Sequence, residues 1–113
     1  MSDWTVEEAT KIADTLLEVA RSLPVRPLRY QLYRQGREWQ RAARELDGAD
    51  EGEAAIELIG NVVRGMSLVG DSESGWVEVV AINGGGTGVG VDQDGRTIWR
   101  NFHGSTSPVV VRA

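Results

Sequence analysis

The chain has one histidine, His103, and no cysteine. A zinc site at His103 would need carboxylate ligands such as Asp92, Asp94 or Glu78, and one histidine with carboxylates is a weak ligand set for zinc. As a general base, His103 would need a nucleophile, and the hydroxyl side chains nearest in sequence are those of residues 105–107. Neighbours along an extended chain rarely take the geometry of a catalytic triad. The sequence therefore predicts that His103 is neither catalytic nor a metal ligand.

Two glycine-containing motifs resemble ligand-binding loops but lack essential parts. The glycine-rich run from Gly84 to Gly90 has neither the glycine spacing of a dinucleotide-binding loop nor the lysine of a P-loop, and no helix is expected after it. The segment from Asp92 to Gly95 begins like a calcium loop, but the later ligands are missing. Glycines at turns and in a closely approached strand explain the first motif better, and a hairpin turn explains the second. We therefore predict no cofactor and no metal.

A stripe of arginines is the best candidate for a binding surface. From Arg26 to Arg44 the chain has six arginines and one acidic residue. At helical spacing, four of these arginines share a face, and two nearby tyrosines complete a composition that is typical of binding hot spots. The predicted partner-binding residues are Tyr30, Tyr33, Arg34, Arg37, Arg41 and Arg44.

The same stripe also has a simpler explanation. Arg34 and Glu38, and likewise Arg41 and Glu45, are spaced for ion pairs across one turn of a helix. In that case the stripe is a solvated helix surface. The segment from Glu45 to Glu57 has six carboxylates and no base, so the two segments either neutralise each other or form a bipolar surface that steers partners.

Apolar periodicity predicts helices in the first part of the chain. The first begins at Thr5, which forms a capping box with Glu8, and it is stopped by Pro24. The second covers residues 27–46, with Gly36 in its middle. Because glycine is a poor helix former, we expect a kink or a break at this position.

A third helix is predicted from Glu53 to Met66, where the apolar residues recur at a spacing of three or four. This helix is expected to form the centre of the core. Leu58, Ile59 and Val62 are predicted to be fully buried between the other helices and a sheet.

Four strands are predicted after this helix, because the apolar period changes to two and turn residues recur. Asn83–Gly84 and Asp94–Gly95 are strong signals for hairpin turns. The predicted strands are Trp76–Ile82, Thr87–Asp92, Thr97–Phe102 and Val109–Val111. The large aromatic side chains of these strands are expected either to pack in the core or to leave a patch exposed on the outer face.

The predicted fold is therefore α+β, with three N-terminal helices packed on a C-terminal four-stranded antiparallel meander. Residues 1–113 are expected to form a single domain, with a helical half at 1–68 and a β half at 76–112.

Composition restricts the functional classes. The net charge of −5 argues against general nucleic-acid binding, and no apolar run is long enough to span a membrane. The N-terminus lacks the features of a signal peptide, so the cytoplasm is the expected compartment. Lys11 is the only lysine among 12 basic residues, a bias that is typical of a GC-rich genome and favours a bacterial origin.

The sequence favours a small, non-enzymatic protein that binds another protein, for example an immunity-type or other inhibitor protein. The alternative is a small enzyme or ligand-binding domain, with a site between sheet and helices that uses His103, Asp92 and Arg100. Both interpretations are compatible with a homo-oligomer.

Overall fold

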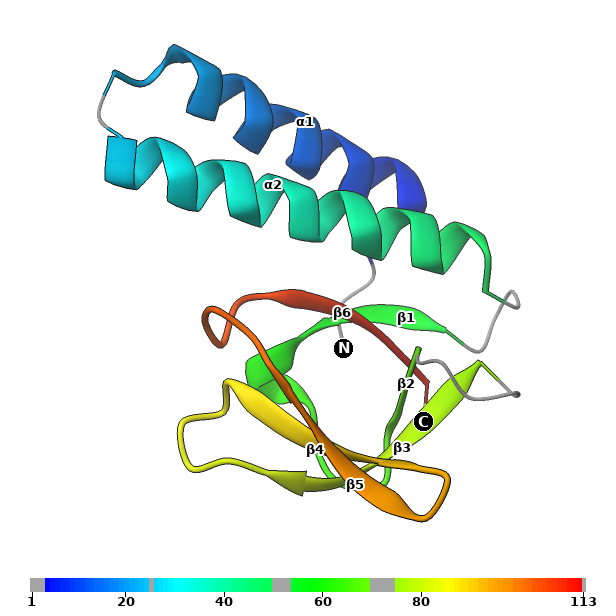
Figure 1. The fold of residues 1–113 in the computed structure, drawn as a ribbon. Coiled ribbons are helices and arrows are strands. Elements are labelled where there is room, and N and C mark those ends of the chain that lie inside the picture. The colour runs from blue at the N-terminus through cyan, green and yellow to red at the C-terminus, as the bar shows by residue number, and fades with distance from the viewer. Residues whose placement is uncertain (1–3, 25, 50–53, 70–74, 113) are drawn as a thin grey trace.

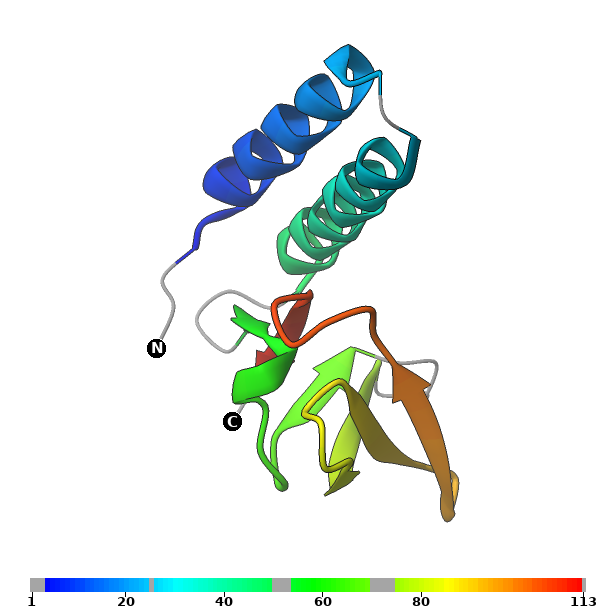
Figure 2. The ribbon, with the colours of Figure 1, turned by 90° about the vertical axis from the view of Figure 1, so that its left-hand side faces the viewer.

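A computed structural model describes residues 4–24, 26–49, 54–69 and 75–112. These residues form two helices, a short 3-10 helix and one antiparallel sheet of six strands in the order β1-β6-β2-β3-β4-β5. The helices form a hairpin on one side of the curled sheet, with α2 in contact with β1 and β6 (Figures 1 and 2). The elements are α1 Val6–Ser22, α2 Arg26–Asp47, β1 Ala55–Leu58, η1 Ile59–Asn61, β2 Ser67–Val69, β3 Trp76–Ile82, β4 Gly88–Gln93, β5 Arg96–Asn101 and β6 Pro108–Arg112.

Helix α1 begins at the predicted capping box. Thr5 Oγ1 accepts a hydrogen bond from the backbone N–H of Glu8, and Glu8 Oε1 accepts one from the N–H of Thr5, both at 3.1 Å. These bonds satisfy donors that have no partner inside the helix. The buried face of α1 is made mainly of small side chains, which lets the two helices approach closely: Ala9, Ala13, Leu17 and Ala20.

Helix α2 runs without interruption from Arg26 to Asp47, so the predicted break at Gly36 is wrong. Gly36 is buried where α2 crosses α1, and a Cβ atom at this position would lie 2.8 Å from the side chain of Leu17. The close approach of the two helices therefore explains this glycine. Neither α1 nor α2 combines the length and hydropathy that a bilayer-spanning helix requires.

The third predicted helix does not exist in the described residues, which instead form β1, η1 and β2 between residues 55 and 69. The apolar residues of this segment lie in two different cores rather than on one helical face. Ile56 packs toward the helices, whereas Ile59 and Val62 point into the interior of the sheet. Gly65 has a φ of 96°, which a continuing α-helix does not allow. The sequence also predicts a capping box of Asp50 with Glu53 for this helix, and both residues lie outside the described residues.

The predicted burial of this segment is confirmed in part. Ile59 and Val62 are buried, with 1% and 3% of their surface exposed, but Leu58 is only half-buried. Leu58 ends β1 and packs against the cluster below the helices instead of lying inside the sheet.

The four predicted strands correspond to β3, β4, β5 and β6, but the four-stranded meander is wrong. Strand β6 does not return beside β5. It inserts between β1 and β2, so that Val111 is opposite Ala55 on one side and Leu68 on the other. Strand β1 lies inside the range that was predicted to be helical, and β2 begins directly after it, at Ser67.

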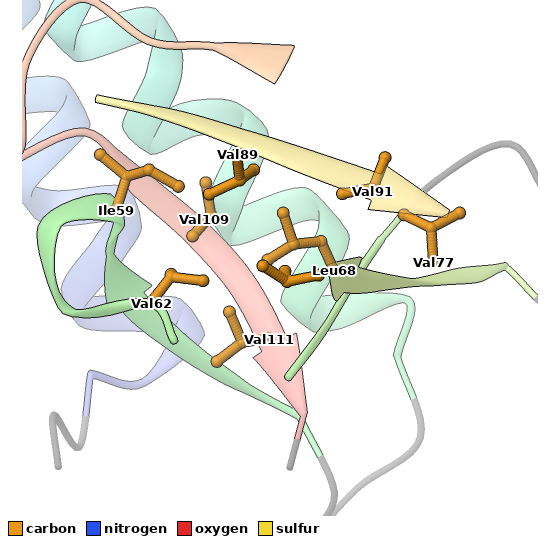
Figure 3. Close-up of a cluster of buried hydrophobic side chains, with 9 residues drawn as sticks. Ile59, Val62, Leu68, Val77, Val89, Val91, Val109 and Val111 are labelled. Carbon is orange, nitrogen blue, oxygen red and sulfur yellow. The ribbon is translucent and has the colours of Figure 1, made fainter. Parts of the chain in front are cut away.

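The structure has two hydrophobic cores separated by β6. Val109 and Val111 point into the interior of the curled sheet, where nine buried residues meet (Figure 3). Val110 points to the opposite side and joins Ile56 and Trp39 in the core beneath the helices. The indole of Trp39 is also in edge-to-face contact with that of Trp4, with ring centroids 5.1 Å apart. Strand β6 therefore holds the helical hairpin and the sheet together.

The loop between β5 and β6 packs closely against η1. The backbone N–H of Gly60 donates to the carbonyl of Ser105 at 2.8 Å, and a Cβ at Gly60 would lie 2.8 Å from Ser105 Cβ. We expect Gly60→Ala to lower the free energy of unfolding by about 1–3 kcal/mol, because backbone or side chain must shift to relieve the clash. Gly104→Ala is the control, since a Cβ there meets nothing within 4 Å. Equal urea midpoints for the two variants would contradict this packing.

Candidate protein-binding site

Two arginine–tyrosine pairs lie on the exposed face of α2. The guanidinium carbon of Arg34 is 4.9 Å from the ring centroid of Tyr30, and that of Arg37 is 5.4 Å from the ring of Tyr33. Arg37 Nη1 also donates a weak hydrogen bond of 3.4 Å to the hydroxyl of Tyr33. Helical spacing of four residues aligns each pair. Tyr30 and Tyr33 remain 64% and 41% exposed, so their rings are accessible to a partner.

Five of the six predicted partner-binding residues line one shallow cleft of about 350 Å³. They are Tyr30, Tyr33, Arg34, Arg37 and Arg41, with Glu38 as the remaining lining residue. The sixth, Arg44, lies elsewhere, in a cleft between α2 and α1 that also contains Asp14 and Asp47. We refer to the five residues that share the first cleft as the α2 stripe.

The ion pairs expected within α2 are not formed. No nitrogen of Arg34 lies within 4.0 Å of a Glu38 oxygen, and the same is true of Arg41 and Glu45. The Glu38 Oε1 atom is buried without a hydrogen-bond partner. The arginine heads of the stripe therefore are not neutralised by direct contact with the carboxylates one turn away.

His103 contacts the stripe from the sheet side. Its Nδ1 atom is 3.0 Å from Arg34 Nη1. Since a guanidinium can only donate, a hydrogen bond between these two atoms has Nδ1 as its acceptor. His103 lies in the loop after β5, so this contact connects α2 to that loop. It holds Arg34 in position within the stripe.

Arg100, near the end of β5, also reaches toward α2. Its Nη1 atom donates a hydrogen bond of 2.7 Å to the carbonyl of Val69, and its guanidinium lies 5.9 Å from the ring centroid of Phe102. Arg41, Glu45 and Arg100 line a small cleft of about 150 Å³ between α2 and the sheet. Basic side chains from a helix and a strand therefore meet along one groove.

Comparison of the chain with protein-family models, curated proteins and solved structures finds no match.

Burial raises the pKa of Glu45 above its ordinary value of 4.5, although Arg100, Arg41 and Arg44 oppose this shift. The charged form of Glu45 therefore destabilises the fold, and this penalty appears as the pH rises through the folded-state pKa. We expect Glu45→Gln to be more stable than wild type at about pH 7, and to lose this advantage at about pH 3.5. Urea unfolding at both pH values measures the difference. A less stable variant at neutral pH would show that attraction between Glu45 and the arginines outweighs the cost of burying its charge.

The alternative site around His103, Asp92 and Arg100 is not assembled as one constellation. Asp92 is exposed on β4, where it lies opposite Glu78 and Thr97. It does not line the cleft of Arg100 or the cleft of about 510 Å³ that includes His103. Within the described residues, no group of three or more histidine, cysteine, aspartate or glutamate side chains could hold a metal ion.

The sequence interpretation missed one feature of this region and left a second, the exposure of aromatic side chains on the sheet, as an open alternative. Glu38 was considered only as a partner for Arg34, but it lines the stripe cleft, the Arg100 cleft and the His103 cleft. Ile98 and Trp99 are 42% and 49% exposed on β5, and an edge position could not be assigned to this strand without the sheet order. Of the predicted aromatic residues, Trp76 and Phe102 are partly buried against the cores.

Proposed function

We propose that this protein is a non-enzymatic interaction protein that binds an acidic surface of another protein through the α2 stripe. The observation that supports this proposal is the placement of the guanidinium groups. Arg34 and Arg37 lie against exposed tyrosine rings and are not paired with Glu38 or Glu45. Their remaining N–H donors can bind the carboxylates of a partner in a bidentate manner.

The tyrosines would supply the apolar part of this interface. A ring that is already held by a neighbouring arginine loses little side-chain entropy when a partner covers it. Tyrosine and arginine together give buried area and directional hydrogen bonds, which is the usual composition of an interface hot spot. An inhibitor of the immunity type, which acts by binding alone, is the specific form of this function that we propose.

The charge of the whole chain would help to orient the partner. The protein carries a net charge of −5, whereas the α2 stripe is locally basic. An acidic partner is therefore attracted to the stripe and repelled by much of the remaining surface. This favours a single orientation in the encounter complex.

The proposal can be tested by recovering proteins from a native lysate on immobilised wild type and on the double variant Arg37→Glu with Arg41→Glu. The control is Lys11→Glu with Arg64→Glu, which gives the same change in net charge at exposed positions outside the stripe. A stoichiometric acidic protein that binds wild type and the control, but not the stripe variant, is the expected result. Equal recovery on all three proteins would contradict the proposal.

A further inference from the structure

Among the described residues, strand β5 forms one end of the sheet and pairs with β4 alone (Figure 1). Its hydrogen-bonding pattern is fixed at both ends. Gln93 and Arg96 flank the two-residue turn at Asp94 and Gly95, whose φ angles are 55° and 82°. At the other end, the N–H of Phe102 donates to the carbonyl of Thr87 at 2.8 Å. Along an antiparallel ladder, residue pairs that exchange hydrogen bonds alternate with pairs that do not. The pairs at the two ends of β5 therefore define the same alternation along the strand.

This pattern directs the backbone groups of Thr97, Trp99 and Asn101 away from β4. Ile98 and Arg100 are the residues that exchange hydrogen bonds with Val91 and Val89. The N–H and C=O groups of the other three residues point to the side where no described strand lies. Strand β5 therefore presents a regular row of donors and acceptors that can pair with another strand.

The side chains of β5 are also exposed. Trp99 lies on the outer face beside Gly90, where a Cβ would be 3.5 Å from its ring, and it is still 49% exposed. Ile98 is 42% exposed on the opposite face and lines a groove of about 370 Å³ with Arg41 and Arg100. An added strand would thus meet the ring of Trp99 on one side. On the other side it would meet a groove in which two arginines, Arg41 and Arg100, lie beside one carboxylate, Glu45, and apolar side chains.

We propose that β5 accepts an extended acidic segment of the partner protein as a seventh strand. Arg96 and Arg100 lie on the same face of β5, which carries no acidic residue, and Arg41 of α2 borders the same groove. Acidic side chains at alternate positions of the added strand face these arginines, while its other side chains cover Trp99. This inference rests on the proposed function, because it specifies how the acidic partner binds.

A second copy of the chain fits this edge less well. Antiparallel pairing of β5 with β5 brings two arginines from each copy onto one ladder, with no carboxylate on the strand to neutralise them. Like charges on neighbouring strands are destabilising. An acidic strand removes this repulsion and replaces it with attraction.

The probe for this inference is an acetylated and amidated peptide of alternating glutamate and valine, about eight residues long. The NMR amide signals of the full chain report where it binds. We expect slower hydrogen exchange at Thr97, Trp99 and Asn101, and little change at Ile98 and Arg100, whose amides already pair with β4. A peptide of alternating lysine and valine should not bind. Methylation of alternate backbone nitrogens in the glutamate peptide should abolish binding.

The matched variants are Thr97→Pro and Thr97→Val. Proline removes one outward N–H and is tolerated at an edge strand, whereas valine keeps both the N–H and the shape of the side chain. Affinity for the glutamate peptide should fall by about tenfold in the proline variant, as expected for the loss of one hydrogen bond, and should stay unchanged in the valine variant. The N-methylated peptide gives the same test on wild type if the proline variant does not fold.

Three outcomes would overturn the inference. In the first, the glutamate peptide does not bind. In the second, the peptide binds but protects no amide of β5 and perturbs only the α2 stripe. In the third, the protein self-associates through β5, and Thr97→Pro abolishes this association. The second outcome leaves the proposed function intact. Peptide binding that depends on Thr97 but is unchanged by Arg37→Glu alone has the opposite meaning, because Arg37 lines the stripe cleft and not the β5 groove. That result would remove the stripe and keep the edge.

Discussion

Leu68→Ala is expected to lower the free energy of unfolding by about 2–5 kcal/mol. Leu68 lies on β2, has 1% of its surface exposed, and packs among the valines in the interior of the sheet (Figure 3). The substitution leaves a cavity that the surrounding strands can fill only in part. Because domains of this size have a total stability of about 5–15 kcal/mol, the loss is a large fraction of it.

Urea unfolding at equilibrium measures this effect, with Leu28→Ala as the control. Leu28 lies on α2 and is 47% exposed, so its truncation should change the stability by no more than about 0.5 kcal/mol. A Leu68→Ala variant as stable as the Leu28→Ala variant would show that the interior of the sheet is not the main core.

Local signals in the sequence predicted the elements whose hydrogen bonds close locally. The capping box at Thr5 defined the start of α1, and the Asp94–Gly95 turn defined the β4–β5 hairpin, where both turn residues have positive φ. In these cases the determining contacts lie within a few residues of one another. Side-chain chemistry alone was then sufficient to predict the backbone.

The errors arose where the determining contacts are distant in sequence. The apolar residues from Ile56 to Val62 fit a helical period, but they divide between two cores that form only when β6 inserts between β1 and β2. A short run such as Val109 to Val111 contains nothing that specifies its neighbours. Non-local pairing therefore overrode the local helical pattern.

The candidate site was predictable to a similar extent. Helical spacing predicted that four arginines share one face of the continuous helix α2. Three of them line one cleft together with Tyr30 and Tyr33, whereas Arg44 lies in another cleft. The contact of Arg34 with His103 joins residues far apart in the chain, so no sequence pattern indicated it. The sequence also could not show that the Arg34–Glu38 and Arg41–Glu45 ion pairs do not form, because a spacing of four residues permits ion pairs without requiring them.

Reversing the charge of Arg37 and Arg41 is expected to weaken partner binding by more than about a hundredfold. Loss of one guanidinium that is desolvated against a carboxylate typically costs about 2–5 kcal/mol, and the introduced glutamates add repulsion. Both arginines are exposed in the protein alone. Their replacement should therefore change the unfolding free energy by no more than about 1 kcal/mol each.

The kinetics of this variant should show where the effect arises. Charge reversal on an exposed surface slows association, and this part of the effect should shrink as salt concentration rises, because exposed charges are screened over about 8–10 Å. Faster dissociation should persist at high salt, since it reports contacts that are desolvated in the complex. If the stripe only stabilises the helix, the double variant should leave the association and dissociation rate constants unchanged.

The most direct test measures the partner affinity and the unfolding free energy of the same three proteins: wild type, Arg37→Glu with Arg41→Glu, and Lys11→Glu with Arg64→Glu. If the α2 stripe is the binding surface, only Arg37→Glu with Arg41→Glu should lose much of its affinity, and all three proteins should have nearly equal stability. A large loss of stability in the Arg37 and Arg41 variant, with its affinity unchanged, would contradict it.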